Sequence, residues 1–279
     1  MAVLSALGTA GSAVRRNPVV LAAAAIYGLV YVPTLLLQAS GSVALNLLGS
    51  GYSFLALFVA PFVAGGVLAM ANEAIDGRTD WRMFVTGGKQ NYLRILVAAL
   101  LYGVVSLLVG VALSFVVFAV VLAGSGVGAG GGLVIAVALL FGGVVALALF
   151  VAGFFLQFYP HAVVVEGYGV ADAFKRSAGL VRNHFASALG YTALLVALSV
   201  GIGVASFLAS LLVLGGGALL EPAGVGGAAG APGPATSGPS LVVLAGYAVG
   251  YVVMSGVVGG YVGTYSVAFY RELLDAESE

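Results

Sequence analysis

Two histidines and two carboxylates are the side chains of this sequence best suited to chemistry: His161, Glu166, Glu73 and His184. Imidazole and carboxylate groups together can hold a metal ion. Their spacing matches neither H-E-x-x-H nor any other metal-binding motif. Cysteine is absent, which removes thiol catalysis, disulfides and thiolate metal sites. The pattern therefore predicts no catalytic residue, no metal site and no cofactor. An enzyme is the alternative only if His161, Glu166 and Glu73 converge.

The composition decides the environment of these side chains. Of the 279 residues, 62% are hydrophobic and 7% are charged, and the mean hydropathy is +1.16. A soluble domain is about 45–50% apolar and about 25% charged, so this chain is expected to be an integral membrane protein. Its four polar candidates then lie at interface depth. Ten basic and ten acidic residues leave no positive field, so no nucleic acid is expected as a partner.

Six stretches of the chain reach the length of about 20 apolar residues that a helix needs to cross a bilayer. They are Val19–Gln38, Tyr52–Ile75, Leu93–Ala123, Leu133–Phe158, Phe185–Leu214 and Leu241–Tyr270. These stretches are apolar on all sides and lack the alternation of a transmembrane barrel. The sequence thus predicts an all-α bundle of six transmembrane helices, folded as a single domain over residues 1–279.

The basic residues predict the orientation of the bundle. All ten lie before the first span, between or at the edges of spans two and three, between spans four and five, or after span six. The connections Ala39–Gly51, Gly124–Gly132 and Gly215–Ser240 contain no Lys or Arg, and the last of them is expected to be a flexible loop. By the positive-inside rule both termini are cytoplasmic, in a multi-pass protein of the cell membrane. The first span is expected to act as an uncleaved signal anchor.

A short signature recurs before each odd-numbered span. It reads Arg16-Asn17-Pro18, then Lys89-Gln90-Asn91-Tyr92, then Arg182-Asn183-His184. Asparagine favours the N-cap of a helix, and the neighbouring basic residues suit headgroup anchoring. We interpret the signature as capping and anchoring, with ligand binding as the alternative.

Amphipathic segments precede the same spans. Before span five, Val170, Phe174, Val181 and Phe185 share one helical face, and before span three a shorter stripe is broken by Gly87-Gly88. The first sixteen residues carry a third version with Leu4, Leu7 and Val14. Such segments are expected to lie in the cytoplasmic interface with the apolar face in lipid. The candidate interface and headgroup residues are Trp81, Arg82, Lys89, Asn91, Arg94, Phe174, Lys175, Arg176, Arg182 and Asn183.

The spans themselves offer packing features and few polar groups. In the last span, Gly246 and Gly250, and then Gly256 and Gly260, are four residues apart, a spacing that lets helices approach closely. Packing within the bundle is the expected role, and dimerisation is the alternative. The span centres hold no ionisable residue, which weighs against ion-coupled transport. Glu73, near the end of span two, is expected to pair with Arg78 or Arg94.

Two observations keep a permease open as an alternative. Pro33 and Pro61 predict kinks or local breaks in the first two spans, and broken helices can mark transport sites. Tyrosines also lie within the spans. A continuous polar cavity near Tyr27, Tyr102 or Tyr251 would favour transport, whereas a tightly packed centre would count against it.

One stretch resembles a known family. It runs Val164-Val165-Glu166, Ala171-Asp172-Ala173-Phe174-Lys175-Arg176-Ser177 and Val181-Arg182-Asn183. It resembles the membrane domain attached to some bacterial glycerophosphodiester phosphodiesterases and, most closely, an uncharacterised haloarchaeal family of multi-pass membrane proteins. That group places an acidic residue, an A-x-x-x-S cytoplasmic helix and a basic-asparagine pair before the next span. Eight Arg against two Lys and an acidic tail agree with such a source. The phosphodiesterase chemistry belongs to a separate soluble barrel, so the resemblance implies no catalytic residues here.

These patterns lead to one functional hypothesis and one alternative. The absence of ionisable groups at depth and the presence of amphipathic segments favour a non-enzymatic membrane module. We expect it to organise membrane lipids or a partner protein, either in the membrane or in the cytoplasm. The alternative is a permease for a small or lipid-like solute.

Overall fold

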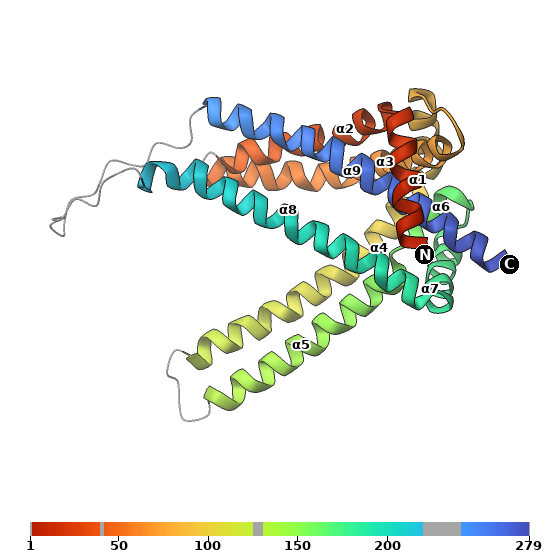
Figure 1. Ribbon diagram of the computed structural model, residues 1–279. Coiled ribbons are helices and arrows are strands. Elements are labelled where there is room, and N and C mark those ends of the chain that lie inside the picture. Colours follow the sequence, from red (N-terminus) through yellow and green to blue (C-terminus); the bar gives the residue numbers. More distant parts are fainter. Residues whose placement is uncertain (1, 40–41, 125–130, 220–240, 279) are drawn as a thin grey trace. The chain divides into compact units, whose positions relative to one another are not determined.

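The chain folds almost entirely into helices in a computed structural model (Figure 1). The structure describes residues 2–39, 42–124, 131–219 and 241–278. Within these ranges the helices are α1 (Ala2–Arg16), α2 (Val19–Gln38), α3 (Val43–Asp76), α4 (Trp81–Gly124), α5 (Gly131–Leu156), α6 (Tyr159–Val165), α7 (Val170–Asn183), α8 (Phe185–Leu219) and α9 (Leu241–Ser278).

Six of these helices are long and apolar enough to cross a membrane: α2, α3, α4, α5, α8 and α9. The prediction of an all-α protein with six such helices is confirmed for the described residues. The reason is that an apolar chain in lipid must satisfy every backbone N–H and C=O internally, which a helix does within one segment.

Several helices extend beyond the apolar stretches that predict them. α3 begins at Val43 instead of Tyr52, and α4 begins at Trp81 instead of Leu93. α9 continues past Tyr270 to Ser278. α8 continues to Leu219, so the first residues of the expected loop Gly215–Ser240 are helical. Its remaining residues, 220–240, lie outside the described part of the chain.

The two prolines do not break their helices. Pro33 lies inside α2 and Pro61 lies inside α3, and both helices continue on either side. The prediction of local breaks is therefore wrong. Neighbouring helices and local adjustments in a membrane helix can satisfy the carbonyl group that a proline leaves without a donor.

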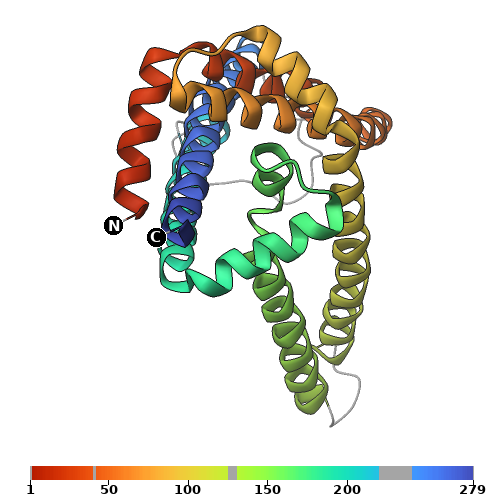
Figure 2. The ribbon, with the colours of Figure 1, turned by 90° about the vertical axis from the view of Figure 1, so that its right-hand side faces the viewer.

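The residue contacts divide the chain into two compact units: unit 1 comprises Met1–Gly88 and Ala186–Glu279, and unit 2 comprises Lys89–Phe185. In unit 1, α2 packs along α9 and α3, and α1 packs against α9 and α3. Figure 2 shows α1 beside α9. The core of this unit includes Val20, Ala23, Val67, Met70 and Phe84, all of them buried.

The face of α1 that packs on the bundle is made of alanines. Ala6, Ala10 and Ala13 are fully buried, whereas Leu4 is 75% exposed. The apolar stripe of larger residues that the sequence suggests is therefore not the packed face of this helix. Alanine has no side chain beyond Cβ, so its face allows a close approach between helix backbones.

Gly87 and Gly88 do not interrupt their helix, because α4 runs through both of them. They are packing positions: a Cβ on Gly87 would clash with Ala69, and one on Gly88 would lie 2.8 Å from a ring carbon of Phe62. Gly66 in α3 makes the complementary approach to Phe84. The two glycines that the sequence predicts to interrupt the amphipathic stripe therefore form a close contact between α3 and the first turns of α4.

Unit 2 contains a short hairpin built from α6 and α7. α7 packs against α6 and α5. Leu180 and Val181 of α7 are fully buried, and the Phe174 ring lies 5.1 Å from that of Tyr159 in α6. Of the apolar face that the sequence assigns to lipid contact, Val181 is buried, Val170 and Phe174 are half-buried, and Phe185 is 51% exposed.

Candidate functional site

The first of the three asparagine signatures caps two helix ends, because Asn17 donates to the Ala13 carbonyl of α1 at 3.1 Å and also reaches the end of α3. Asn17 is 3% exposed, and its side-chain amide donates to the carbonyl groups of Gly77 (2.9 Å) and Ala74 (3.4 Å). Its side-chain oxygen accepts a hydrogen bond from the backbone N–H of Thr79 (3.0 Å). The last turn of any helix leaves carbonyl groups without intrahelical partners. Asn17 thus closes the C-terminal end of α3 and the loop that follows.

The expected N-cap role is wrong for Asn17, Asn91 and Asn183. The residue at the N-cap of α2 is Pro18, with no side-chain capping bond. Asn91 is buried in the interior of α4, which begins ten residues earlier at Trp81. Asn183 is exposed and is the last residue of α7. One recurring sequence pattern therefore occupies three different structural positions.

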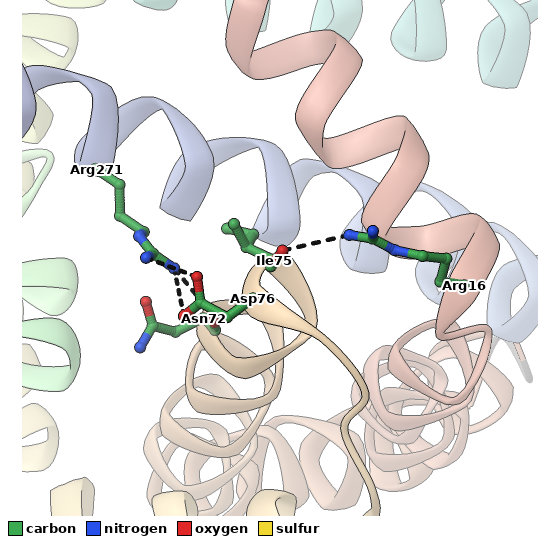
Figure 3. A network of polar contacts seen from close by, with 5 residues as sticks. All are labelled: Arg16, Asn72, Ile75, Asp76 and Arg271. Carbon is green, nitrogen blue, oxygen red and sulfur yellow. Dashed lines mark hydrogen bonds and ion pairs between the residues drawn. The ribbon is translucent and has the colours of Figure 1, made fainter.

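Two arginines complete this capping of α3 (Figure 3). Arg16, at the end of α1, donates to the Ile75 carbonyl at 3.3 Å. Arg271, in α9, pairs with both carboxylate oxygens of Asp76 at 2.8 and 2.9 Å and approaches the Asn72 carbonyl at 3.4 Å. Positive charge beside the C-terminal end of a helix is favourable. We call this region, made of Arg16, Asn17, Asp76 and Arg271, the charged end of unit 1.

The pairing predicted for Glu73 is wrong. Its buried Oε2 has no hydrogen-bond partner among the described residues. Arg94 instead donates to the Gly167 carbonyl at 2.8 Å. Asp76, three residues further along α3, is the carboxylate that pairs with an arginine. The arginine comes from α9, so proximity along the chain gave no indication of it.

Ser177 holds the hairpin of unit 2 together. Its hydroxyl is completely buried, donates to the Phe155 carbonyl (2.8 Å) and accepts from the Phe158 backbone N–H (3.1 Å). These two backbone groups lie at the break between α5 and α6, where intrahelical bonds are lost. Ser177 and the fully buried Ala173 are the two named positions of the A-x-x-x-S pattern, so that pattern has a structural role here.

An ion pair and a glycine complete the hairpin. Arg176 pairs with Glu166 at 3.2 Å, with side-chain exposures of 26% and 20%. Gly167 adopts a φ of +74°, a conformation that residues with a Cβ adopt at a cost. Arg176 is therefore a structural residue of the hairpin, although the sequence places it among headgroup contacts.

The remaining candidate interface residues divide by exposure. Trp81, Arg82, Lys89, Lys175, Arg182 and Asn183 are exposed, as is Arg94. Phe174 is half-buried and Asn91 is buried. Lys175 already has a partner, because Asp172 lies 3.6 Å away on the same helix.

Five exposed cations have no partner within the part of the chain that the structure describes. No carboxylate there pairs with the side chains of Arg15, Arg78, Arg82, Lys89 or Arg182. Arg15 and Arg78, which the sequence did not single out as candidates, belong to this set. An exposed cation without an internal partner is available to an anion outside the chain.

The residues proposed for metal chemistry do not form a metal site. Among the described residues, no group of three or more His, Asp or Glu side chains gathers closely enough to hold a metal ion. His161 is buried in α6, with its ring 5.8 Å from that of Phe158.

A cavity of about 550 Å³ lies in unit 1 among α2, α3, α8 and α9. Its polar groups are the hydroxyls of Tyr27, Tyr247, Tyr251 and Ser255. The rest of its wall is apolar, and Tyr102 does not line it. The cavity is therefore neither the continuous polar path expected of a permease nor a tightly packed centre.

The four candidate packing glycines of α9 separate into two pairs. A Cβ on Gly256 would lie 2.9 Å from the Leu21 carbonyl oxygen, and one on Gly260 would lie 3.0 Å from the Leu21 Cα. Gly246 and Gly250 have no atom within 4 Å of the Cβ position. Gly256 and Gly260 therefore allow close contact with α2, and Gly250 lines the cavity.

Neither a curated protein nor a solved structure shows a significant match to the chain. A family model described as a domain of unknown function, DUF7847, matches residues 1–273. Since the match covers almost the whole sequence, the chain belongs to the DUF7847 family.

Proposed function

We propose that this protein is a non-enzymatic module of the cell membrane that gathers anionic lipids at its cytoplasmic face. Six helices cross the bilayer in this proposal, with both termini in the cytoplasm. The observation that carries it is the set of five exposed cations without partners: Arg15, Arg78 and Arg182 precede long apolar helices, and Arg82 and Lys89 lie in the first three turns of α4. Each Lys or Arg near an anionic membrane surface contributes about 1 kcal/mol of attraction.

The geometry of the charged end supports the proposed orientation. The beginning of α2, the end of α3 and the C-terminal part of α9 meet there, through Arg16, Asp76 and Arg271. After an even number of crossings, the start of the first span and the end of the last span lie at the same membrane face. The positive-inside rule makes that face cytoplasmic.

The first turn of α4 is the best-defined contact with headgroups. Trp81 is 45% exposed, and Arg82 beside it is exposed and without a carboxylate partner. Tryptophan favours the membrane–water interface, where its ring and N–H are both accommodated. Arg78 precedes this turn, so two cations and an interfacial aromatic ring come from one short segment.

Lipid selectivity tests the proposal. The purified protein is placed in nanodiscs of phosphatidylcholine with phosphatidylglycerol, and bound lipids are counted by native mass spectrometry. Wild type should retain the anionic lipid in preference, and Arg78→Gln with Arg82→Gln should lower that preference at least about twofold. Lys175→Gln is the matched control, since Asp172 already balances that charge. Equal retention of both lipids by wild type would contradict the proposal.

The cavity favours one second candidate, a permease for a lipid-like solute. Its apolar wall suits a hydrocarbon better than a polar solute. The test is movement of a fluorescent phospholipid between leaflets of vesicles that contain the protein. Flipping well above the rate of protein-free vesicles would replace the lipid-gathering proposal with transport, and an unchanged rate would eliminate transport of this phospholipid.

A further inference from the structure

The cavity of unit 1 has the size and chemistry of a ligand site. Its volume of about 550 Å³ falls within the range of about 300–1,000 Å³ that small-molecule sites occupy. Such sites are mostly apolar, with a few polar groups that orient the ligand. Here Val63, Val67, Met254 and Val258 are among the apolar residues, and the hydroxyls come from three tyrosines and Ser255.

The depth of the cavity selects the kind of ligand. The helical rise from Val19 to Tyr27 is about 12 Å, and the rise from Ser255 to Arg271 is about 24 Å. The hydrocarbon core of a bilayer is about 30 Å thick. Val19 follows Asn17 of the charged end, and Arg271 belongs to that end. Both rises are shorter than the hydrocarbon thickness, so most of the cavity lies at hydrocarbon depth. The molecules available there are lipid chains, because water is excluded from this layer.

The hydroxyls indicate which leaflet supplies the lipid. The helical rise from Tyr247 to Arg271 is about 36 Å, which places Tyr247 near the membrane surface opposite the charged end. Tyr247 is 58% exposed and Tyr27 is 40% exposed, so the cavity is open at its side. Tyrosine hydroxyls at interface depth can hydrogen-bond the ester or headgroup oxygens of a lipid.

We propose that this cavity binds one hydrocarbon chain of a membrane lipid from the leaflet opposite the charged end. The chain lies between α2, α3 and α9, and the polar part of the lipid points toward Tyr247. Gly250 provides the room, because nothing lies within 4 Å of its Cβ position. This site is separate from the cations proposed to gather anionic headgroups, and it requires only that the six helices cross the membrane.

The experiment uses a phospholipid with a photoreactive diazirine in the middle of one chain, reconstituted with the full-length protein. After illumination, mass spectrometry of peptides locates the cross-links. In wild type we expect them to concentrate on the cavity-lining residues of α9 and α3. Gly250→Leu fills the cavity and should lower this labelling at least about fivefold. Gly246→Leu is the matched control. It adds the same side chain at another open position of α9 that does not line the cavity, so it should leave labelling unchanged.

Two results would overturn the proposal. One is equal labelling in wild type and Gly250→Leu. The other is labelling spread over outward residues such as Val249, which is 64% exposed, without enrichment at the cavity. The wild-type protein alone allows a second test by native mass spectrometry after a detergent wash. If the cavity binds a lipid, one lipid per chain should be retained. If the cavity is empty, no lipid should be retained. Arg78→Gln with Arg82→Gln should not change this count, so the failure of either proposal is distinguishable from that of the other.

Discussion

The charged end of unit 1 and the cavity are formed by the same helices, yet they are built in opposite ways. At the charged end, buried polar groups close the backbone, and Asn17 satisfies the end of α3. Further along α9, Gly256 and Gly260 lie against Leu21 of α2. The cavity occupies a neighbouring face of α9, where Ser255 and Gly259 line it together with three tyrosines.

This difference shows that the same glycine spacing serves two purposes within one helix. At Gly256 and Gly260, a missing side chain permits contact with α2. At Gly246 and Gly250, a missing side chain leaves space. Substitutions at matched positions should therefore have large effects in the first region and small effects in the second.

The largest effect is expected for Asn17→Ala. It leaves the buried Ala74 carbonyl, the half-buried Gly77 carbonyl and the half-buried Thr79 N–H without their partner. Each buried group left unpaired costs about 1–3 kcal/mol. The free energy of unfolding, measured by SDS titration in mixed micelles, should fall accordingly. Asn183→Ala removes the same side chain from an exposed position, and an equal loss there would contradict the special role of Asn17.

A second large effect is expected for Gly256→Leu. Its new side chain must displace the Leu21 backbone and Ala25, so α2 and α9 must separate. Overpacking of this kind costs about 1–3 kcal/mol. The same titration should show this loss, with Gly246→Leu close to wild type. If both variants behaved alike, the distinction between the two glycine pairs of α9 would be wrong.

A smaller effect is expected for the ion pair of the charged end. Arg271 and Asp76 are 32% and 63% exposed, and pairs this exposed contribute at most about 1 kcal/mol. A double-mutant cycle of Asp76→Asn and Arg271→Gln, measured at low and high salt, should give a coupling energy that salt reduces. A salt-independent coupling would mean that the pair is shielded from solvent.

The smallest effect on stability is expected for Gly250→Leu. The position is open, so the free energy of unfolding should change by no more than about 0.5 kcal/mol. Thermal unfolding followed by tyrosine fluorescence provides the check. A loss as large as that of Gly256→Leu would show that the cavity closes in the membrane, and the two regions would then be alike.

The sequence predicts the membrane helices well and their contacts poorly. Apolar stretches of about 20 residues locate the six long helices, because lipid enforces helical hydrogen bonding. Helix ends were less predictable, since α3 and α4 begin in segments that apolar content does not mark. The pattern of larger apolar residues does not indicate the alanine face of α1. Ala6, Ala10 and Ala13 at helical spacing carried that signal.

The contacts of polar residues are also difficult to predict from the sequence. Asn17, Arg176 and Ser177 stand in recurring or recognisable sequence patterns, but these patterns do not indicate their hydrogen-bond partners. Asn17 meets the loop after α3, and Ser177 meets the break between α5 and α6. Each partner lies far away along the chain, so no local rule of capping could identify it.

Composition and apolar length by themselves determined the six helices of the described residues that are long and apolar enough to cross a membrane, because the cost of burying backbone polar groups in lipid leaves no other local structure. Tertiary structure alone decided which glycines pack, which asparagine closes α3, which cations are left without partners and where a cavity forms. Those outcomes depend on the register between helices distant in sequence, and that register is fixed by the packing of side chains on facing surfaces.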